Sequence, residues 1–260
     1  MNTFNTKQEK LLKLWLHEEK IAHIHGWNFS HINGKYEEEH DLPWNYKAII
    51  KDFLKPEMKL LDIDTSGGEF LLSLNHPYCN LAATENYPPN VELCETKLIP
   101  LGINFQKADS DNKLPFDNQE FNIIINRHGN YRPDEIWRLL KSDGIFITEQ
   151  VGAENDRELV KLLLDDVPDI PFPDQYLKIA QKKFEKLGFA IIRSEEVFRP
   201  IKFWDVGALV WFARIIEWEF PNFNVRDCLE NLYHAQEILE EKGVIEGMIH
   251  RFLLMVKKQC

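Results

Sequence analysis

From residue 58 onward, short apolar runs alternate with segments whose apolar positions recur at helical spacing. Residues 121–126 are almost wholly apolar, which is typical of a central strand buried on both faces. Pro88 and Pro89 mark the start of one helical segment, and Gly188 follows the end of another. This alternation predicts an α/β fold with a mostly parallel sheet that helices cover on both faces.

The predicted strands are apolar runs bounded by turn residues, and they span residues 58–63, 79–84, 103–107, 121–126, 144–150, 189–197 and 250–257. The predicted helices span residues 68–74, 89–101, 133–141, 154–164 and 176–187.

Two regions fall outside this alternation. Residues 1–55 are predicted to form an N-terminal helical cap whose aromatic residues are Trp27, Phe29, Trp44 and Tyr46. Residues 203–243 form an insertion between the last two strands that contains Trp204, Trp211 and Trp218. We expect this helical aromatic insertion to form a lid over the carboxyl ends of the strands, where open α/β sheets bind ligands. The core would then comprise residues 56–202 and 244–260, within one structural domain overall.

Composition narrows the class of protein. The chain has 260 residues, 44% of them hydrophobic, which suffices for one large α/β domain with an elaboration. The sequence has no signal-peptide pattern at its N-terminus and no apolar stretch of the roughly 20 residues that cross a bilayer, so we expect a cytoplasmic protein. The scattered cysteines Cys79, Cys94, Cys228 and Cys260 indicate reduced thiols. The nearest histidine pair, His23 and His25, lacks companion ligands, so we predict no metal site.

The formal net charge of −11 disfavours a nucleic-acid partner, because proteins that bind nucleic-acid backbone usually present a basic face. The basic cluster of the chain is a short helical segment that Glu185 dilutes, and it consists of Lys178, Lys182, Lys183 and Lys186. The charge therefore favours a small molecule or a protein as substrate.

The most informative stretch is Leu60-Leu61-Asp62-Ile63-Asp64-Thr65-Ser66-Gly67-Gly68-Glu69-Phe70-Leu71. An apolar run, a short glycine-containing loop and an amphipathic segment predict a strand, a tight turn and a helix whose first amides point at a ligand. The stretch resembles motif I of class I S-adenosylmethionine (SAM)-dependent methyltransferases, commonly Asp-x-Gly-x-Gly-x-Gly. Asp64 and Ser66 replace the first two glycines of the loop, Gly68 keeps its place, and Gly67 lies beside it.

Later strand ends extend the resemblance. Glu85 matches the acidic residue that accepts the ribose hydroxyls, and Asp109, followed by Ser110, matches the one that accepts from the adenine amino group. Residues 114–122 resemble the family's loop into the fourth strand. The resemblance implies a Rossmann-like, seven-stranded, mostly parallel sheet with an antiparallel last strand, and SAM as cofactor. The implied cofactor-binding residues are Asp62, Asp64, Gly67, Gly68, Glu85, Asp109, Ser110, Asn126 and Tyr46.

Each acidic residue also has a simpler interpretation. Asp62 could cap the following helix, Glu85 could be a surface carboxylate, and Asp109 lies in an ordinary turn sequence. Tyr46 could pack the cap on the sheet rather than close over SAM. The substitutions in motif I predict weaker SAM binding than in a typical member, by about 1–3 kcal/mol.

A narrower resemblance links the chain to a bacterial group of methyltransferase-domain proteins. It rests on Pro43-Trp44-Asn45-Tyr46, Asn126-Arg127-His128, Gln150-Val151-Gly152 and Phe203-Trp204-Asp205-Val206-Gly207-Ala208. That group supplies no substrate that can be transferred to this chain.

The chemical step of a methyltransferase needs a nucleophile in line and few protein groups. His128, just beyond the fourth strand, is the candidate general base, although it could instead bond a loop backbone. Arg127 could bind an acidic substrate or form a salt bridge with a helix. The candidate acceptor-pocket residues are Trp204, Asp205 and Trp211, although aromatic residues at helical spacing more often form core.

Three functional hypotheses follow. The first is a SAM-dependent methyltransferase acting on a small-molecule acceptor. The second keeps the cofactor and makes ribosomal or transfer RNA the acceptor. The third is a degenerate, non-catalytic fold that binds SAM, its demethylated product or a partner protein, and the replaced glycines favour it. The sequence does not predict the acceptor or the oligomeric state.

Overall fold

The structure is a computed structural model that describes residues 6–23, 29–38 and 41–259. Trp27, His25 and Cys260, which entered the sequence analysis, lie outside the described residues.

The chain forms two compact units. The sheet unit comprises residues 43–152, 174–197 and 251–259 of the described chain. The helical unit comprises described residues 6–23, 29–38, 41–42, 153–173 and 198–250. Strands β7 (Phe189–Phe203) and β8 (Ile245–Lys258) contribute residues to both units.

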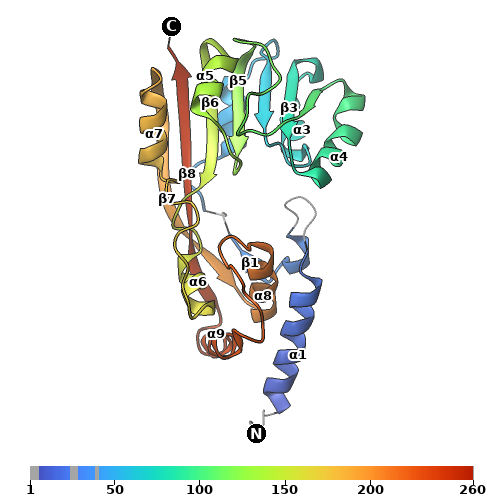
Figure 1. Cartoon of the computed structure of the whole chain (residues 1–260), viewed down its shortest axis with the longest axis vertical. Helices are drawn as coiled ribbons and strands as arrows, with labels where there is room; N and C mark the ends of the chain where they lie inside the picture. Colours follow the sequence, from blue (N-terminus) through green and yellow to red (C-terminus); the bar gives the residue numbers. More distant parts are fainter. Residues whose placement is uncertain (1–5, 24–28, 39–40, 260) are drawn as a thin grey trace. The chain divides into compact units, whose positions relative to one another are not determined.

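Parallel strands form most of the sheet unit (Figure 1). The strands are β2 (Leu60–Ile63), β3 (Leu81–Glu85), β4 (Asn104–Lys107), β5 (Phe121–Arg127) and β6 (Leu140–Val151). β2 pairs in parallel with both β3 and β5, β4 pairs with β3, and β6 with β5. The last strand, β8, runs antiparallel to β6, with Ile145 opposite Lys257. The predicted mostly parallel α/β sheet with an antiparallel last strand is thus confirmed.

The predicted number of strands was wrong. The described residues contain a sheet of eight strands rather than seven, in the order β1-β7-β8-β6-β5-β2-β3-β4. The additional strand, β1 (Tyr36–Glu37), lies in the segment predicted to be helical and pairs antiparallel with β7, with Tyr36 opposite Phe203. Two residues are too few to show the alternating pattern from which strands are predicted.

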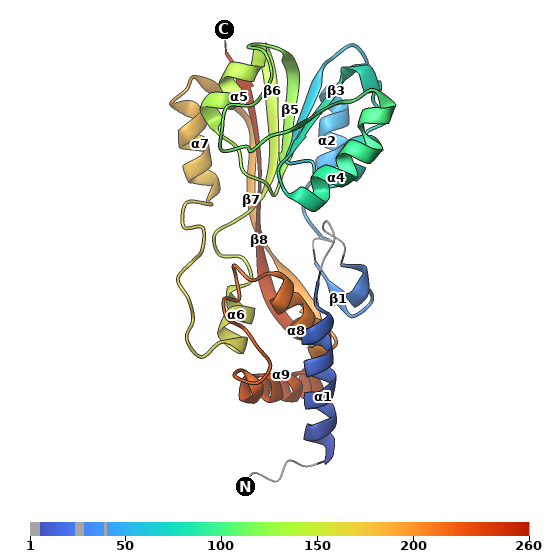
Figure 2. The same ribbon diagram turned by 45° about the vertical axis from the view of Figure 1, so that its right-hand side comes forward.

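Helices and an apolar core complete the sheet unit. The helices are α2 (Tyr46–Phe53), α3 (Glu69–Ser73), α4 (Pro88–Lys97), α5 (Pro133–Leu139) and α7 (Leu177–Glu185), with 3-10 turns at Tyr78–Asn80 and Ile99–Leu101. α4 packs against β3 and β4, and α5 packs against β6 (Figure 2). Fully buried Leu61, Ile124, Phe146 and Phe184 lie in the core cluster of this unit. Burial of these side chains fixes the strand ends that carry the candidate site.

The helical unit has a core of its own around Trp15, Phe203 and Trp211. Its helices are α1 (Thr6–Ile21), α6 (Arg157–Leu163), α8 (Val206–Ile215) and α9 (Leu229–Lys242), with a 3-10 turn at Ser30–Ile32. α8 packs against both α1 and α9, and α6 packs against α9 (Figure 1).

The two units divide the chain differently from the predicted cap at 1–55 and insertion at 203–243. α2 belongs to the sheet unit, and residues 153–173 belong to the helical unit. The lid function of the insertion stays a prediction. Among the described helices, none combines the length and apolar character that a membrane crossing needs.

Candidate functional site

The loop after β2 has an unusual backbone. β2 is buried along its whole length, and the chain then passes through positive φ angles at Asp64 (56°), Ser66 (57°) and Gly68 (79°). Gly68 suits this conformation, and a Cβ there would also lie 2.8 Å from the side chain of Leu98. A positive φ costs a residue with a side chain about 1–2 kcal/mol, and aspartate tolerates it better than most. The loop therefore keeps the turn of motif I at a conformational cost.

Asp62 organises this loop from the end of β2. Its side chain is buried, and its Oδ2 accepts a hydrogen bond of 2.6 Å from the hydroxyl of Thr65. The backbone N–H of Thr65 donates in turn to the carbonyl of Thr84, at the end of the neighbouring strand β3 (2.9 Å). These contacts hold the loop against the carboxyl ends of β2 and β3.

Asp64 is packed into the site rather than directed to solvent. Its Oδ2 accepts a hydrogen bond of 2.9 Å from the hydroxyl of Ser110, which is buried. A Cβ added to Gly129 would lie 2.7 Å from the Cβ of Asp64. The backbone after β5 thus approaches Asp64 so closely that only glycine fits at residue 129.

Glu85, at the end of β3, is buried rather than on the surface. Its Oε1 accepts from the backbone N–H groups of Asn86 (2.8 Å) and Tyr87 (2.9 Å), and its Oε2 accepts from the side chain of Asn90 (3.3 Å). These bonds orient the carboxylate at the start of α4. Because a carboxylate offers about four acceptor positions, Oε2 keeps capacity for a further donor.

Asp109 and Ser110 follow β4. The carboxylate of Asp109 accepts from the backbone N–H of Asp111 (2.9 Å) and from the side chain of Asn112 (3.1 Å). This is the self-contained turn that the sequence also allowed. Ser110 instead connects the β4 end to Asp64, so the two neighbouring residues have different local roles.

Crowded carboxylates make the site electronegative. Burial raises the pKa of Asp62 to about 7, with the charges of Asp64 and Glu85 adding to the shift and the Thr65 hydrogen bond opposing it. Burial likewise raises the pKa of Asp64 to about 6, where Glu85 and Asp109 add to the shift and the Ser110 bond opposes it. Burial and the neighbouring acidic groups therefore both destabilise the ionised form of each carboxylate. A positively charged ligand would offset the repulsion from the neighbouring acidic groups.

Asn126 anchors the end of β5 with a network of buried polar groups. Its side chain is fully buried, donates to the carbonyl of Ile63 (3.0 Å) and accepts from the side chain of Gln150 (2.6 Å). Tyr46 donates to the carbonyls of Asn126 (3.1 Å) and Ile147 (3.0 Å), and its ring stacks on Phe70. Tyr46 therefore packs α2 onto the sheet. Burial raises the pKa of its hydroxyl well above the ordinary value, and the charges of Asp62 and Glu149 add to this.

Arg127 and His128 lie beside a buried carboxylate on the next strand. Glu149 Oε1 lies 3.9 Å from Arg127 Nε and 3.8 Å from His128 Nε2. Glu149 Oε2 accepts a hydrogen bond of 2.6 Å from the indole N–H of Trp44. His128 adopts a positive φ of 59°, and its backbone N–H donates to the carbonyl of Glu149. The guanidinium of Arg127 lies over the ring of Phe70.

The predicted acceptor-pocket residues of the insertion belong to the helical unit. Asp205 caps α8 by accepting from the backbone N–H of Ala208 (2.7 Å), and its carboxylate lies 3.7 Å from Lys35 Nζ. Trp211 is buried in the core of that unit, whereas Trp204 is 42% exposed. Trp211 thus lies in a core, which is the alternative that the sequence left open, whereas Asp205 is a partly exposed helix cap.

Sequence reasoning missed Glu149, Thr65 and Gly129. The sequence contains one indication of Glu149, since an acidic residue in the middle of an apolar strand needs buried partners. It contains no indication of Gly129, because residue 129 must be glycine only where it approaches Asp64, which is remote in the sequence. Within the part of the chain that the structure describes, no group of three potential metal ligands is found.

Comparison with known proteins agrees with this fold. No model of a protein family matches the chain. A carboxy-S-adenosyl-L-methionine synthase of Nautilia profundicola is 27% identical over 151 residues, which cover 52% of this chain. The match spans 63% of the length of that relative.

Two of the crystal structures that match this chain at low sequence identity superpose as follows. One, from Bacillus halodurans C-125 and provisionally described as a methyltransferase, superposes with a TM-score of 0.57 at 15% identity, over 83% of this chain and 99% of its own. The other, a functionally unknown protein from Deinococcus radiodurans R1, superposes with a TM-score of 0.56 at 12% identity, over 98% of this chain and 100% of its own.

These matches define an α/β protein with a Rossmann-like fold. More narrowly, the chain has the fold of class I SAM-dependent methyltransferases. The fold that the sequence resemblance implied is thus confirmed.

Proposed function

We propose that the chain is a SAM-dependent methyltransferase with a small-molecule acceptor, and that SAM binds at the carboxyl ends of β2 and β3. The observation that carries the proposal is the loop of residues 64–68. It turns on positive φ angles and is held by Asp62 and Thr65 beside the buried carboxylate of Glu85. This is the arrangement by which a strand–loop–helix unit presents amides and an acidic acceptor to a nucleoside.

The donor and acceptor set fits SAM. SAM carries a sulfonium and an ammonium charge, and the carboxylates of Asp62 and Asp64 have pKa values raised by burial and by acidic neighbours. A cationic ligand would offset the repulsion among these carboxylates. Glu85 Oε2 would accept from the ribose hydroxyls with its remaining capacity.

When bound, SAM supplies a methyl group on a sulfonium centre that a nucleophile can displace in line. Arg127, the last residue of β5, and His128, which follows it, would serve the acceptor. Arg127, with its side chain 46% exposed, would bind an acidic group, and His128 would take a proton from an acceptor that is protonated at neutral pH. Glu149 would position both side chains and stabilise the positive charge that His128 gains.

The test is calorimetric titration of SAM and S-adenosylhomocysteine into the intact chain and into a Glu85→Ala variant. We expect the variant to weaken SAM binding at least tenfold, about 1.4 kcal/mol, because the ribose hydroxyls lose their charged acceptor. Glu92→Ala, an exposed residue of α4, is the matched control and should leave the affinity within about twofold. Equal affinities in the two variants would exclude Glu85 from the cofactor site.

A second candidate comes from the N. profundicola relative, whose name states that it makes carboxy-S-adenosyl-L-methionine. In that case SAM itself would be the molecule altered. Mass spectrometry of the reaction mixture separates the candidates, since methyl transfer releases S-adenosylhomocysteine, whereas the product of the alternative is carboxy-S-adenosyl-L-methionine. Tight SAM binding with neither product, across acceptor pools from cell extracts, would support the non-catalytic hypothesis.

A further inference from the structure

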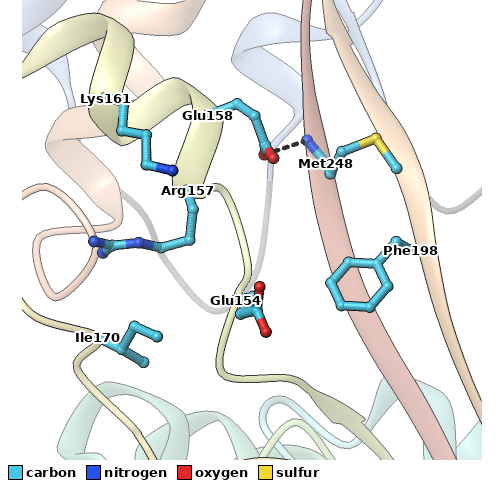
Figure 3. A pocket seen from close by; sticks show the side chains of 7 residues that line it. All are labelled: Glu154, Arg157, Glu158, Lys161, Ile170, Phe198 and Met248. Carbon is cyan, nitrogen blue, oxygen red and sulfur yellow. Dashed lines mark hydrogen bonds between the residues drawn. The ribbon is translucent and has the colours of Figure 1, made fainter.

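The helical unit contains a pocket of about 430 Å³, lined by residues in and around α6 and by Phe198 and Met248 (Figure 3). Its two carboxylates are already engaged within the protein. Glu158 Oε2 accepts a hydrogen bond of 3.1 Å from the backbone N–H of Met248, and Glu154 has an interaction of its own. The charges of both carboxylates are therefore not available to a ligand of this pocket.

One face of α4 holds both the motif I loop and the candidate ribose acceptor. Asn90 and Cys94 lie four residues apart on this helix, so their side chains share a face. Asn90 Nδ2 donates to Glu85 Oε2 (3.3 Å), and the thiol of Cys94 donates to the backbone carbonyl of Ser66 (3.0 Å). The helix therefore links the end of β3 to the middle of the loop after β2.

Cys94 acts as a hydrogen-bond donor rather than as a nucleophile. The residue is fully buried, and burial raises the pKa of its thiol to about 12. The charges of Glu85, Glu69 and Asp62 add to this shift. Because the thiolate and not the thiol is the nucleophile, Cys94 stays protonated and unreactive at neutral pH. Its S–H group remains available to the carbonyl of Ser66.

The carbonyl of Ser66 determines the direction of a neighbouring N–H group. Ser66 has a positive φ of 57°, which is a strained conformation for a residue with a side chain. Its carbonyl and the N–H of Gly67 belong to one planar peptide group, so a bond that fixes the carbonyl also fixes the N–H. In the part of the chain that the structure describes, this N–H has no hydrogen-bond acceptor. It is thus free for an acceptor on a ligand.

The turn around Gly67 suits an oxyanion. Ser66 and Gly68 have positive φ angles, whereas Gly67 between them does not. Turns of this kind direct successive backbone N–H groups into a small concavity that binds anions. SAM and S-adenosylhomocysteine both carry an oxyanion, the carboxylate of their amino-acid part, away from the sugar that Glu85 would bind.

We propose that Cys94 is a positioning residue for the amino-acid end of the cofactor. Its bond to Ser66 holds the N–H of Gly67 toward the carboxylate of that end. This role rests on the proposed SAM site, in which Glu85 binds the ribose. Glu85 keeps its bonds to two backbone N–H groups at the start of α4 whether or not residue 94 has a donor. Binding of the ribose end should therefore not depend on the thiol.

The test compares two ligands by calorimetric titration into the full chain. S-Adenosylhomocysteine and 5′-methylthioadenosine share the adenosine and an uncharged sulfur, and only the first carries the amino-acid end. Cys94→Ala should weaken S-adenosylhomocysteine about fivefold and leave 5′-methylthioadenosine within about twofold. Cys94→Ser keeps a donor, so it should restore the affinity for S-adenosylhomocysteine to within about twofold of the parent.

Cys228→Ala, which alters a buried cysteine of the helical unit, is the matched control and should change neither affinity. Cys94→Val fills the space of the thiol without a donor and should repeat the result of Cys94→Ala, and thermal melts followed by circular dichroism show that each variant is folded. Equal weakening of both ligands, no weakening of either, or the same loss in Cys94→Ser as in Cys94→Ala would overturn the role of Cys94. Those outcomes leave the proposed SAM site standing, whereas failure of S-adenosylhomocysteine to bind the parent chain would overturn that site and this role together.

Discussion

Trp44 donates its indole N–H to the buried carboxylate of Glu149 over 2.6 Å, although 105 residues separate the two in sequence. The same carboxylate lies within 4 Å of Arg127 and His128. One acidic side chain on β6 therefore connects the segment before α2 with the last residue of β5 and the residue after it. The motifs Pro43-Trp44-Asn45-Tyr46 and Asn126-Arg127-His128 are thus two parts of one local structure.

Replacing Trp44 by phenylalanine keeps an aromatic ring and removes the N–H donor. A buried oxygen of Glu149 then loses its hydrogen bond, so the free energy of unfolding should fall by about 1–3 kcal/mol. Urea titration followed by circular dichroism measures this change. The control is Trp204→Phe, whose parent side chain is 42% exposed and whose cost should stay within about 0.5 kcal/mol. Equal costs in the two variants would mean that the bond to Glu149 contributes no net stability.

Asp62 should make the chain less stable as the pH rises. Its pKa is about 7 in the folded chain and near the ordinary 3.8 when unfolded. Between these values the folded state holds a proton that the unfolded state has released, so stability falls as the pH rises from about 4 to 7. Asp62→Asn removes this titration and keeps an oxygen that can accept from Thr65.

The Asp62→Asn variant should therefore be more stable than the parent at pH 8, by about 2–4 kcal/mol, with little difference near pH 4. Urea titrations at pH 4, 6 and 8 measure the difference. Asp52→Asn, an exposed residue of α2, should show no such trend. A gain for Asp62→Asn that is the same at all three pH values would contradict the raised pKa.

Asp64 should give SAM binding a pH dependence that S-adenosylhomocysteine lacks. Burial raises the pKa of Asp64 to about 6, and its ionised form favours the sulfonium charge that only SAM carries. Between pH 5 and 7.5 the ratio of SAM affinity to S-adenosylhomocysteine affinity should rise about 3–10-fold. Asp64→Asn should reduce this rise, leaving only the part that is due to Asp62, whose pKa is about 7. Paired calorimetric titrations measure the change, and a rise of the same size in the variant would assign the effect to another group.

Local pattern predicted the elements that carry the site. The apolar run at 121–126 became β5, and Pro88 begins α4 as expected. An apolar run and a proline both determine the structure of the few residues around them, so they can be read from the local sequence. The extent of β7 could not be predicted in the same way. The strand continues six residues beyond the predicted end at Val197, through charged residues such as Arg199 and Lys202, to Phe203. Pairing with neighbouring strands, rather than its own pattern, keeps this stretch extended.

The candidate site shows the same limit. Asp62 and Glu85 were predicted as site residues because they match acidic residues of the methyltransferase family at the ends of two parallel strands, whose carboxyl ends lie at one edge of the sheet. Their hydrogen-bond partners, Asn90 for Glu85 and Thr65 for Asp62, could not be predicted. These contacts depend on side-chain geometry, which the spacing of residues along the sequence does not determine. The division into two compact units also depends on packing, because residues 153–173 join a core formed mostly by distant segments.

Gly129→Ala should disturb the motif I loop, although residue 129 lies outside that loop in the sequence. The added Cβ would lie 2.7 Å from Asp64 Cβ, which is closer than real Cβ contacts, and 2.9 Å from Asn126 Nδ2. Both neighbours are short, buried or hydrogen-bonded side chains, so the backbone has to move. We expect SAM affinity to fall about tenfold or more, since the amides of the loop are displaced from the ligand.

A second substitution separates steric displacement from general instability. Asp64→Gly removes the side chain that meets the new methyl group, and glycine accepts the φ of 56° at this position without strain. In the Gly129→Ala background, Asp64→Gly should therefore restore a large part of the lost SAM affinity. Because the two residues are in contact, their effects should be strongly non-additive in a double-mutant cycle. If the effects of Gly129→Ala and Asp64→Gly on SAM affinity are additive, the approach of residue 129 to Asp64 does not control the shape of the loop.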